Sequence, residues 1–182
     1  MRIQFAAVLF LAGVAPLLAQ PAPASRTVHA VVNDHLNRVV TGLSLQNFDV
    51  TEDGALRPIT AFFDANSPIS LAIVAQSIPA DVTALRRSDD EIIQAQSVAD
   101  ALRALAQSKN SRRALIFTSG TIVGEIPSDI QVMKTDAQNL KKSVIEVMNS
   151  YSFGFSSASP ASAIEVNLRP PVGLPPLTVT TR

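Results

Sequence analysis

Apolar and polar residues alternate between residues 27 and 64, which is the period of a β-strand with one buried face. The first apolar set is Val28, Ala30 and Val32, and residues typical of turns follow it. Farther along, Asp53-Gly54 separates two more alternating sets, and this dipeptide favours the positive φ angles of a tight hairpin. The pattern therefore predicts a small antiparallel β-module over residues 27–64.

From residue 68 the pattern changes to that of a layered α/β domain. Ile69–Ala75 is almost wholly apolar, as in a strand that is covered on both faces of a parallel sheet. Ser88 and Glu91 have the spacing of a capping box and predict a helix whose apolar face runs to Ala106 and which Lys109–Ser111 ends. Ala114–Phe117 then predicts a second buried strand. Strand, helix and strand over residues 69–118 form a βαβ unit.

A second helix is predicted after Pro127, where Ser128 and Gln131 again have capping-box spacing. Its apolar residues recur at helical intervals, which predicts one buried face packed on the sheet. An alternative is a seam between two copies of the chain, so that an oligomer forms through the helix 130–147. The apolar positions are Ile130, Met133, Ala137, Leu140, Val144 and Val147.

The tail of the chain returns to strand patterning and completes a mixed fold, α/β in its central part and α+β overall. Two alternating apolar sets predict a closing β-hairpin, and Leu177–Val179 predicts a last short strand among prolines. The predicted α/β domain covers residues 68–155, and the second hairpin strand with the Pro-rich tail covers residues 156–182. The two sets are Tyr151, Phe153, Phe155 and Ile164, Val166, Leu168.

The first residues have the layout of a secretory signal peptide. Arg2 precedes an apolar run, and small residues follow it, so cleavage is predicted after Ala19, or alternatively after Ala24. Residues 1–19 are then the signal and residues 20–26 a flexible leader. An uncleaved anchor is the other interpretation, but the apolar run is short for a membrane span. We expect a secreted or periplasmic protein with no membrane span after cleavage.

Composition excludes several kinds of function. Hydrophobic residues make up 47% and charged residues 16%, unlike a disordered chain. Lys+Arg and Asp+Glu both number 15, whereas proteins that bind nucleic acid through phosphates carry a basic excess. Cys is absent, so thiolate sites and disulfides are excluded. The two histidines lie in no zinc motif, and no Gly-x-Ser-x-Gly or phosphate loop occurs, so we predict no catalytic residue and no cofactor.

Three groups of motifs occur in the order found in one family. Val39–Leu43, Asn47–Gly54 and Ile59–Phe63 resemble the opening module of secreted bacterial VWFA-related proteins. Arg112–Gly120 is similar to the later strand of their von Willebrand factor type A domain. Tyr151–Phe155, followed by Pro160 and Ile164–Val166, resembles the closing hairpin of that family. The resemblance implies a reduced Rossmann-like type A domain over residues 68–155.

The chain departs from the family where type A domains bind Mg²⁺ in a metal-ion-dependent adhesion site. That site uses an Asp-x-Ser-x-Ser loop and a later Asp, because a hard cation needs oxygen ligands with carboxylate charge. The matching positions here are Gln76, Ile78, Ala80 and Ser119, so the motif is degenerate and no metal site is expected. The remaining ligand-facing positions that we predict are Gln76, Ser77, Asp81, Thr118 and Ser119.

These features predict an exported, non-catalytic, metal-independent module that binds another protein or an envelope component. Two alternatives stay open: a hydrolase-like periplasmic enzyme with an unrecognised site, and a truncated family member with little function. An enzyme would differ from an interaction module by a cleft that contains a buried carboxylate or histidine.

Overall fold

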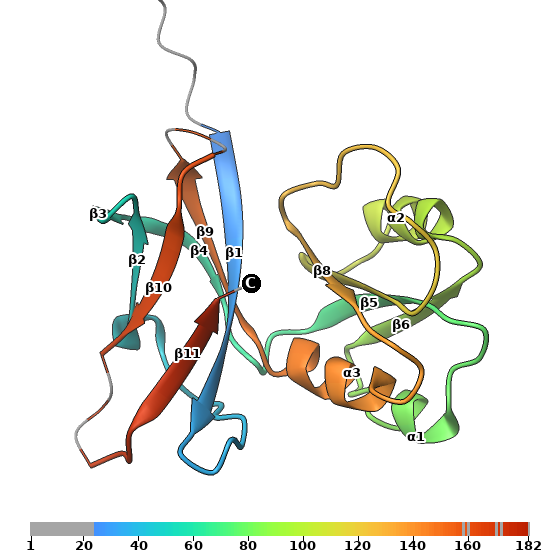
Figure 1. The fold of residues 1–182 in the computed structure, drawn as a ribbon, viewed down its shortest axis with the longest axis horizontal. Coiled ribbons are helices and arrows are strands. Elements are labelled where there is room, and N and C mark those ends of the chain that lie inside the picture. Colours follow the sequence, from blue (N-terminus) through green and yellow to red (C-terminus); the bar gives the residue numbers. More distant parts are fainter. Residues whose placement is uncertain (1–23, 158, 160, 170, 172, 182) are drawn as a thin grey trace, which may run out of the picture.

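A computed structural model describes residues 24–157, 159, 161–169, 171 and 173–181. It divides into a lobe of antiparallel strands and a lobe with a parallel sheet between helices, which lie side by side (Figure 1). The predicted mixed fold, α/β and α+β overall, is confirmed. The predicted signal peptide at residues 1–19 and the start of the leader lie outside the described residues.

The β lobe consists of two antiparallel sheets. One sheet has the strand order β11-β1-β9-β4, and the other has the order β10-β2-β3. A 3-10 turn at Leu45–Asn47 directly precedes β2 along the chain. The strands of the first sheet are β1 (Ala24–Asp34), β4 (Ile59–Phe63), β9 (Tyr151–Ser157) and β11 (Leu177–Thr181). Those of the second are β2 (Phe48–Glu52), β3 (Ala55–Arg57) and β10 (Ile164–Leu168).

The core of the β lobe uses the alternation that the sequence predicts. Val28, Ala30 and Val32 on β1 are buried on one face together with Phe48, Tyr151 and Phe153, and the partly buried Phe62 packs against these rings. The phenol of Tyr151 donates to the carbonyl of Val40 and accepts from the amide of Leu43, each at 3.1 Å. It thereby fixes the segment between β1 and β2 over the core.

The strand pairing corrects the predicted β-module of residues 27–64. The Asp53-Gly54 hairpin is confirmed, with φ angles of 49° and 78°, but its second strand is β3, and β4 crosses to the other sheet. Residues 24–64 do not close a sheet among themselves, because β1 lies between β9 and β11 and its amides and carbonyls pair with both. The leader is also shorter than predicted, since β1 begins at Ala24.

The C-terminal strands exist as predicted, but they do not form a hairpin. Tyr151–Ser157 pairs with β1 and β4 in the first sheet, whereas Ile164–Leu168 pairs with β2 in the second. The predicted boundary at residue 155 is therefore wrong as a limit of the α/β part, because β9 belongs to the β lobe. The α/β lobe is an insertion between β4 and β9.

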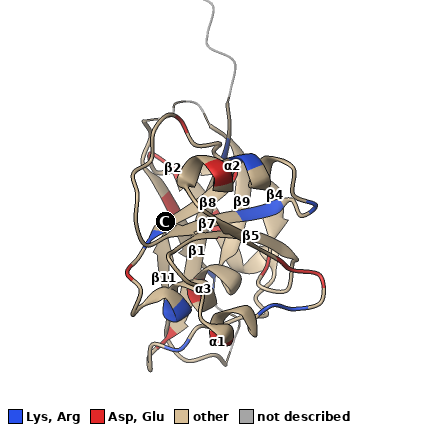
Figure 2. Ribbon diagram, turned by 90° about the vertical axis from the view of Figure 1, so that its right-hand side faces the viewer, with Lys and Arg blue, Asp and Glu red and all other residues tan. Residues whose placement is uncertain are grey.

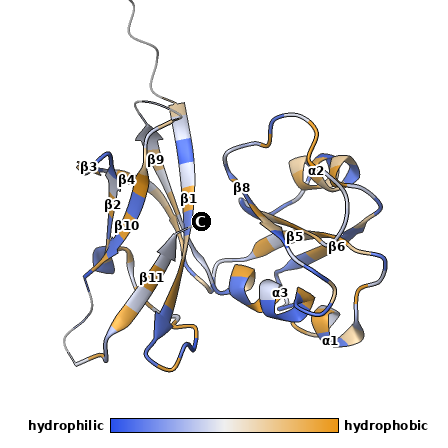
Figure 3. Ribbon diagram, viewed as in Figure 1, coloured by the Kyte–Doolittle hydropathy of each residue, from blue (hydrophilic) through white to orange (hydrophobic). Residues whose placement is uncertain are grey.

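The α/β lobe has one parallel sheet with the strand order β6-β5-β7-β8. Its strands are β5 (Ile69–Val74), β6 (Glu91–Ala95), β7 (Arg112–Phe117) and β8 (Ile130–Lys134). Helices α1 (Ala80–Thr83) and α3 (Leu140–Met148) cover one face, and α2 (Val98–Ala106) covers the other. The central strand β5 is buried along its whole length and strongly hydrophobic (Figure 3).

The helix predicted between Ser88 and Lys109 is wrong in its first half. Residues 91–95 form β6, which pairs with β5, and the helix begins only after Ser97, whose hydroxyl accepts from the amide of Asp100. Ser88 is exposed in a loop where Asp90 accepts hydrogen bonds from the amides of Ile69 and Arg87. That carboxylate fixes the entry to both strands, so the Ser88 and Glu91 spacing has no capping role.

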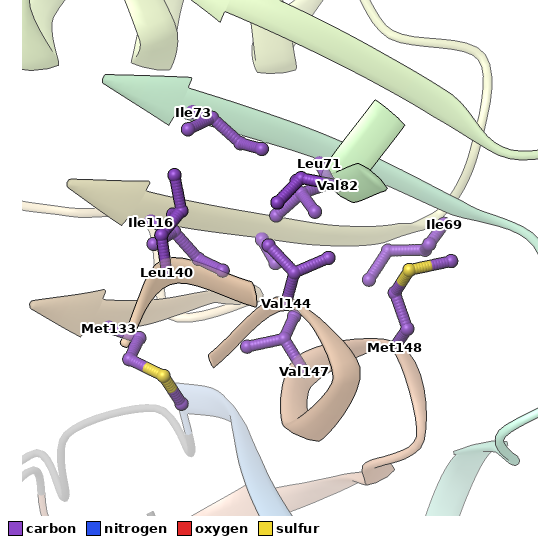
Figure 4. Packing of buried hydrophobic residues seen from close by; sticks show 11 residues of the cluster. Ile69, Leu71, Ile73, Val82, Ile116, Met133, Leu140, Val144, Val147 and Met148 are labelled. Carbon is purple, nitrogen blue, oxygen red and sulfur yellow. The ribbon is translucent and has the colours of Figure 1, made fainter. Parts of the chain in front are cut away.

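The predicted helix over residues 128–147 is also wrong in its first half. Ile130–Lys134 is the edge strand β8, and α3 begins only at Leu140. The helical spacing arises by coincidence, because Met133 of β8 and Leu140, Val144 and Val147 of α3 all reach the same core (Figure 4). Ile130 belongs to the core on the opposite face. A seam between copies through a helix 130–147 therefore has no structural basis, since these side chains are buried within one chain.

The two chain crossings between the lobes meet at Arg112, the first residue of β7. Its guanidinium donates to the carbonyls of Asp64 and Ser67 on one crossing, and to those of Val147, Met148 and Ser150 on the other. The side chain is only 3% exposed. Arg112 therefore joins the end of α3 and both connections in a single buried network.

Candidate functional site

The parallel sheet contains a point where the chain diverges to opposite sides. After β5 the chain continues to β6 at one edge, and after β7 it continues to β8 at the other edge. Loops that leave neighbouring strands in opposite directions open a crevice at the carboxyl ends of those strands, where α/β proteins bind ligands. Gln76 and Ser77 follow β5, and Thr118 and Ser119 follow β7, so this crevice receives the predicted site residues.

The crevice is a hollow of about 320 Å³, which we call the strand-end hollow. Four of the five predicted positions line it, and the fifth, Asp81, does not. Asp81 is exposed on α1, and its Oδ2 lies 2.9 Å from Nζ of Lys141. That hydrogen bond holds the pKa of Asp81 below its usual range. The lining residues are Ala75, Gln76, Ser77, Pro79, Thr118, Ser119, Asp136, Ala137 and Leu140.

Sequence patterning does not identify Asp136, which is the one carboxylate among the described residues that line the strand-end hollow. Asp136 follows β8, and its Oδ1 accepts from the amide of Asn139 at 2.8 Å while both oxygens accept from the Asn139 side chain. These hydrogen bonds lower the pKa of Asp136. The sequence signal for this arrangement is an Asp three residues before an Asn that begins a helix. That signal is hidden because a single helix is predicted across residues 128–147.

The donor set does not fit the Mg²⁺ site that the resemblance implies. The strand-end hollow offers hydroxyl and amide oxygens and one carboxylate, and that carboxylate already binds Asn139. A hard divalent cation needs several anionic or strongly polar oxygens to replace its water. Within the described part of the chain, no group of three or more His, Asp or Glu side chains is placed to hold a metal ion.

A second, more apolar hollow of about 290 Å³ lies on the other side of Ser119, between α2 and the loop after β7. Val98 and Leu102 of α2 line it, together with Val123 of the loop. Val123 is 89% exposed, the highest value among the exposed large hydrophobic side chains of the described residues. The carboxyl ends of the sheet therefore combine a polar hollow, an apolar hollow and a projecting aliphatic side chain.

The hydrolase-like alternative is best represented by a serine next to a histidine, and one such pair occurs among the described residues. His29 Nδ1 lies 2.9 Å from Ser152 Oγ, on adjacent strands of the β lobe. Both residues are buried, and neither lines any of the hollows described for this chain. Burial, and secondarily Arg112, lowers the pKa of His29 to about 4, so the imidazole is a weak base. This geometry favours a packing role between the lobes.

The buried His29 makes stability depend on pH. Its pKa is about 4 in the folded chain against an ordinary 6.5, so the unfolded chain binds the proton more readily. The free energy of unfolding should fall as the pH drops from 7 to 5, and this group should account for roughly 2 kcal/mol of the fall. Urea titrations at each pH measure how steeply the free energy of unfolding changes with pH. His29→Gln should flatten this slope, and the exposed-site control His35→Gln should not. Equal slopes for wild type and His29→Gln would contradict the prediction.

In the view of Figure 2, Lys and Arg residues are interspersed with Asp and Glu residues along the ribbon of the described chain. Several form local ion pairs, including Arg169 with Asp49 and Arg113 with Asp129. This distribution gives no footprint for a polyanion. None of the helices that the structure describes has the length and hydropathy to cross a membrane.

Comparison with protein-family models, with curated proteins and with solved structures gives no match. The similarity to VWFA-related proteins consequently rests on the sequence motifs alone and stays a prediction.

Proposed function

We propose that this chain is an exported, non-catalytic binding module that contacts a protein or envelope component without a metal ion. The observation that supports this is the convergence of Gln76, Ser77, Thr118 and Ser119 on one hollow at the carboxyl ends of the parallel sheet. These groups donate and accept hydrogen bonds, but they neither ionise near neutral pH nor activate a nucleophile. They suit recognition of a polar surface better than chemistry.

The surroundings of the strand-end hollow support a protein partner. The apolar hollow and the exposed Val123 lie directly beside it, on the other side of Ser119. Protein interfaces typically combine an apolar centre with a polar rim that supplies hydrogen bonds. Export is proposed from the signal-like start of the sequence, and the type A-like module from the order of the motifs.

Affinity capture tests this function with a matched pair of variants. The wild-type chain, immobilised and exposed to envelope extract, should retain a defined protein, identified by mass spectrometry, with or without chelator. Ser119→Arg should abolish retention, because Ser119 is exposed between the two hollows. Ser88→Arg, the same change at an exposed position before β6, should retain the partner. Capture that survives Ser119→Arg, or that needs a divalent ion, would refute the proposal.

Metal independence is a separate prediction. Millimolar Mg²⁺ or Mn²⁺ should leave the thermal midpoint of the chain unchanged relative to chelator. A site filled at 100 times its dissociation constant would add about 2.7 kcal/mol of stability, which a melting curve resolves. A shift that disappears in Asp136→Asn but persists in Asp89→Asn, an exposed acid outside the strand-end hollow, would show that a metal site exists there.

A further inference from the structure

A hollow with a larger volume than the strand-end hollow lies between the two lobes. This interlobe cleft has a volume of about 620 Å³. Val31, Asn33 and Thr180 line it from β1 and β11, and Lys142 and Ile145 line it from α3. Clefts of roughly 300–1,000 Å³ at domain boundaries are where proteins bind small molecules. None of the predicted site residues lines this cleft, although Asp81 pairs with Lys141 in its wall.

The interlobe cleft combines apolar and polar walls. Val39 from the β lobe and Ile145 from α3 are partly exposed and give it apolar surface, whereas Val31 is only 1% exposed and lies behind that surface. Asn33, Asn37 and Gln138 add amide groups around this surface, so a ligand would meet apolar contacts and hydrogen bonds together. A ligand of matching chemistry has an apolar body and a polar head.

The charge of the interlobe cleft indicates the sign of that head. Two lysines and one glutamate line it. Lys141 is already paired with Asp81 at 2.9 Å, and Glu146 has an interaction of its own. The ion pairs of the described residues do not include Lys142, which is exposed at the cleft. Lys142 therefore carries a positive charge that an anionic head could neutralise.

We propose that the interlobe cleft binds a small amphipathic organic anion, such as a carboxylate with an aliphatic or aromatic body. Its apolar part lies against Val39 and Ile145, and its anionic group faces Lys142. Because residues of both lobes line the cleft, the bound ligand holds the lobes together. This inference does not rest on the proposed function, and either can fail without the other.

The probe for this proposal is 8-anilinonaphthalene-1-sulfonate, an aromatic sulfonate that fluoresces in apolar surroundings. The folded chain should bind it saturably, and octanoate should displace it. Lys142→Gln should weaken binding about tenfold, the equivalent of one charge-assisted hydrogen bond. Lys109→Gln, an exposed lysine that does not line the cleft, should leave binding unchanged. Equal affinities of wild type and Lys142→Gln would overturn the proposal.

The location of the bound probe is tested with a reporter, because the chain contains no Trp. Thr180→Trp places an indole at the wall of the interlobe cleft, and Gln107→Trp places one at the end of α2, on the opposite side of the parallel sheet. Energy transfer to the probe should be stronger from the first variant. Equal transfer from both would mean adventitious binding elsewhere and would refute the site. If the chain sediments with vesicles of anionic phospholipid and octanoate does not displace the probe, the cleft would instead be a lipid-binding surface and the proposal would be refuted.

Discussion

Replacing Arg112 with Met should lower the free energy of unfolding by roughly 3–5 kcal/mol. Methionine keeps much of the length of the side chain but removes every donor, so the carbonyls on both chain crossings lose their partner inside a buried network. A hydrogen bond to a charged group contributes about 1.5–3 kcal/mol, and a buried acceptor left without a donor adds its desolvation cost. Urea denaturation followed by circular dichroism measures the loss.

The neighbouring residue provides the matched control for Arg112. Arg113 pairs with Asp129 on a part-exposed surface, and the side chains of Arg113 and Asp129 are 26% and 39% exposed. Exposed ion pairs contribute about 0–1 kcal/mol, so Arg113→Met should cost about 1 kcal/mol or less. Equal losses for the two variants would mean that Arg112 does not hold the crossings together.

Arg112 keeps its proton at neutral pH despite its burial. Burial lowers the pKa of its guanidinium to about 10, with Arg87 as the next cause. At neutral pH the side chain is therefore still a full cation that can donate all its hydrogens. Arg87 supports the same crossing, because its guanidinium donates to the carbonyl of Ala65 and to the carboxylate of Asp90. Loss of Arg112 should consequently loosen the link between the lobes before either core opens.

Local patterning predicts most strands of this protein because strand alternation is a property of consecutive residues. Val28, Ala30 and Val32 lie on one buried face as expected, and the apolar run from Ile69 is the buried central strand. The pairing of strands, in contrast, depends on residues that are far apart in the sequence. The partners of β1 lie more than 120 residues away in β9 and about 150 away in β11, and no local signal encodes that choice. The interlobe cleft follows from this distant pairing, so it too escaped the sequence analysis.

The errors at β6 and β8 have a common physical cause. Each strand is followed within a few residues by a helix that buries side chains in the same lobe, so apolar positions from both elements fall by chance on a helical period. Capping-box spacing then supported the wrong start at Ser88 and at Ser128. The strand-end positions were easier, because polar residues directly after a buried strand lie at the sheet edge whatever follows them. Asp136 was missed because its strand was missed.

Replacing Leu140 with Ala should cost about 2–5 kcal/mol of stability, the range for a buried large-to-small change. Leu140 opens α3, is 1% exposed, and packs under the parallel sheet with Val82, Ile116 and Val144 (Figure 4). The truncation removes apolar contact and leaves a cavity that the rigid sheet above cannot fill. Leu36→Ala, in the turn after β1 where the side chain is 60% exposed, should change stability by about 0.5 kcal/mol or less.

A further variant separates the observed arrangement from a continuous helix over residues 128–147. Ala137 lies in the turn between β8 and α3, so Ala137→Pro should cost much less than Leu140→Ala. In a helix interior the same proline would remove a hydrogen bond and cost about 3 kcal/mol or more. If α3 instead formed a seam between copies, the difference in unfolding midpoint between Leu140→Ala and wild type would depend on protein concentration. For a core buried within one chain, the loss of stability in Leu140→Ala is independent of protein concentration, because Leu140 then contacts only the sheet and helices of its own chain.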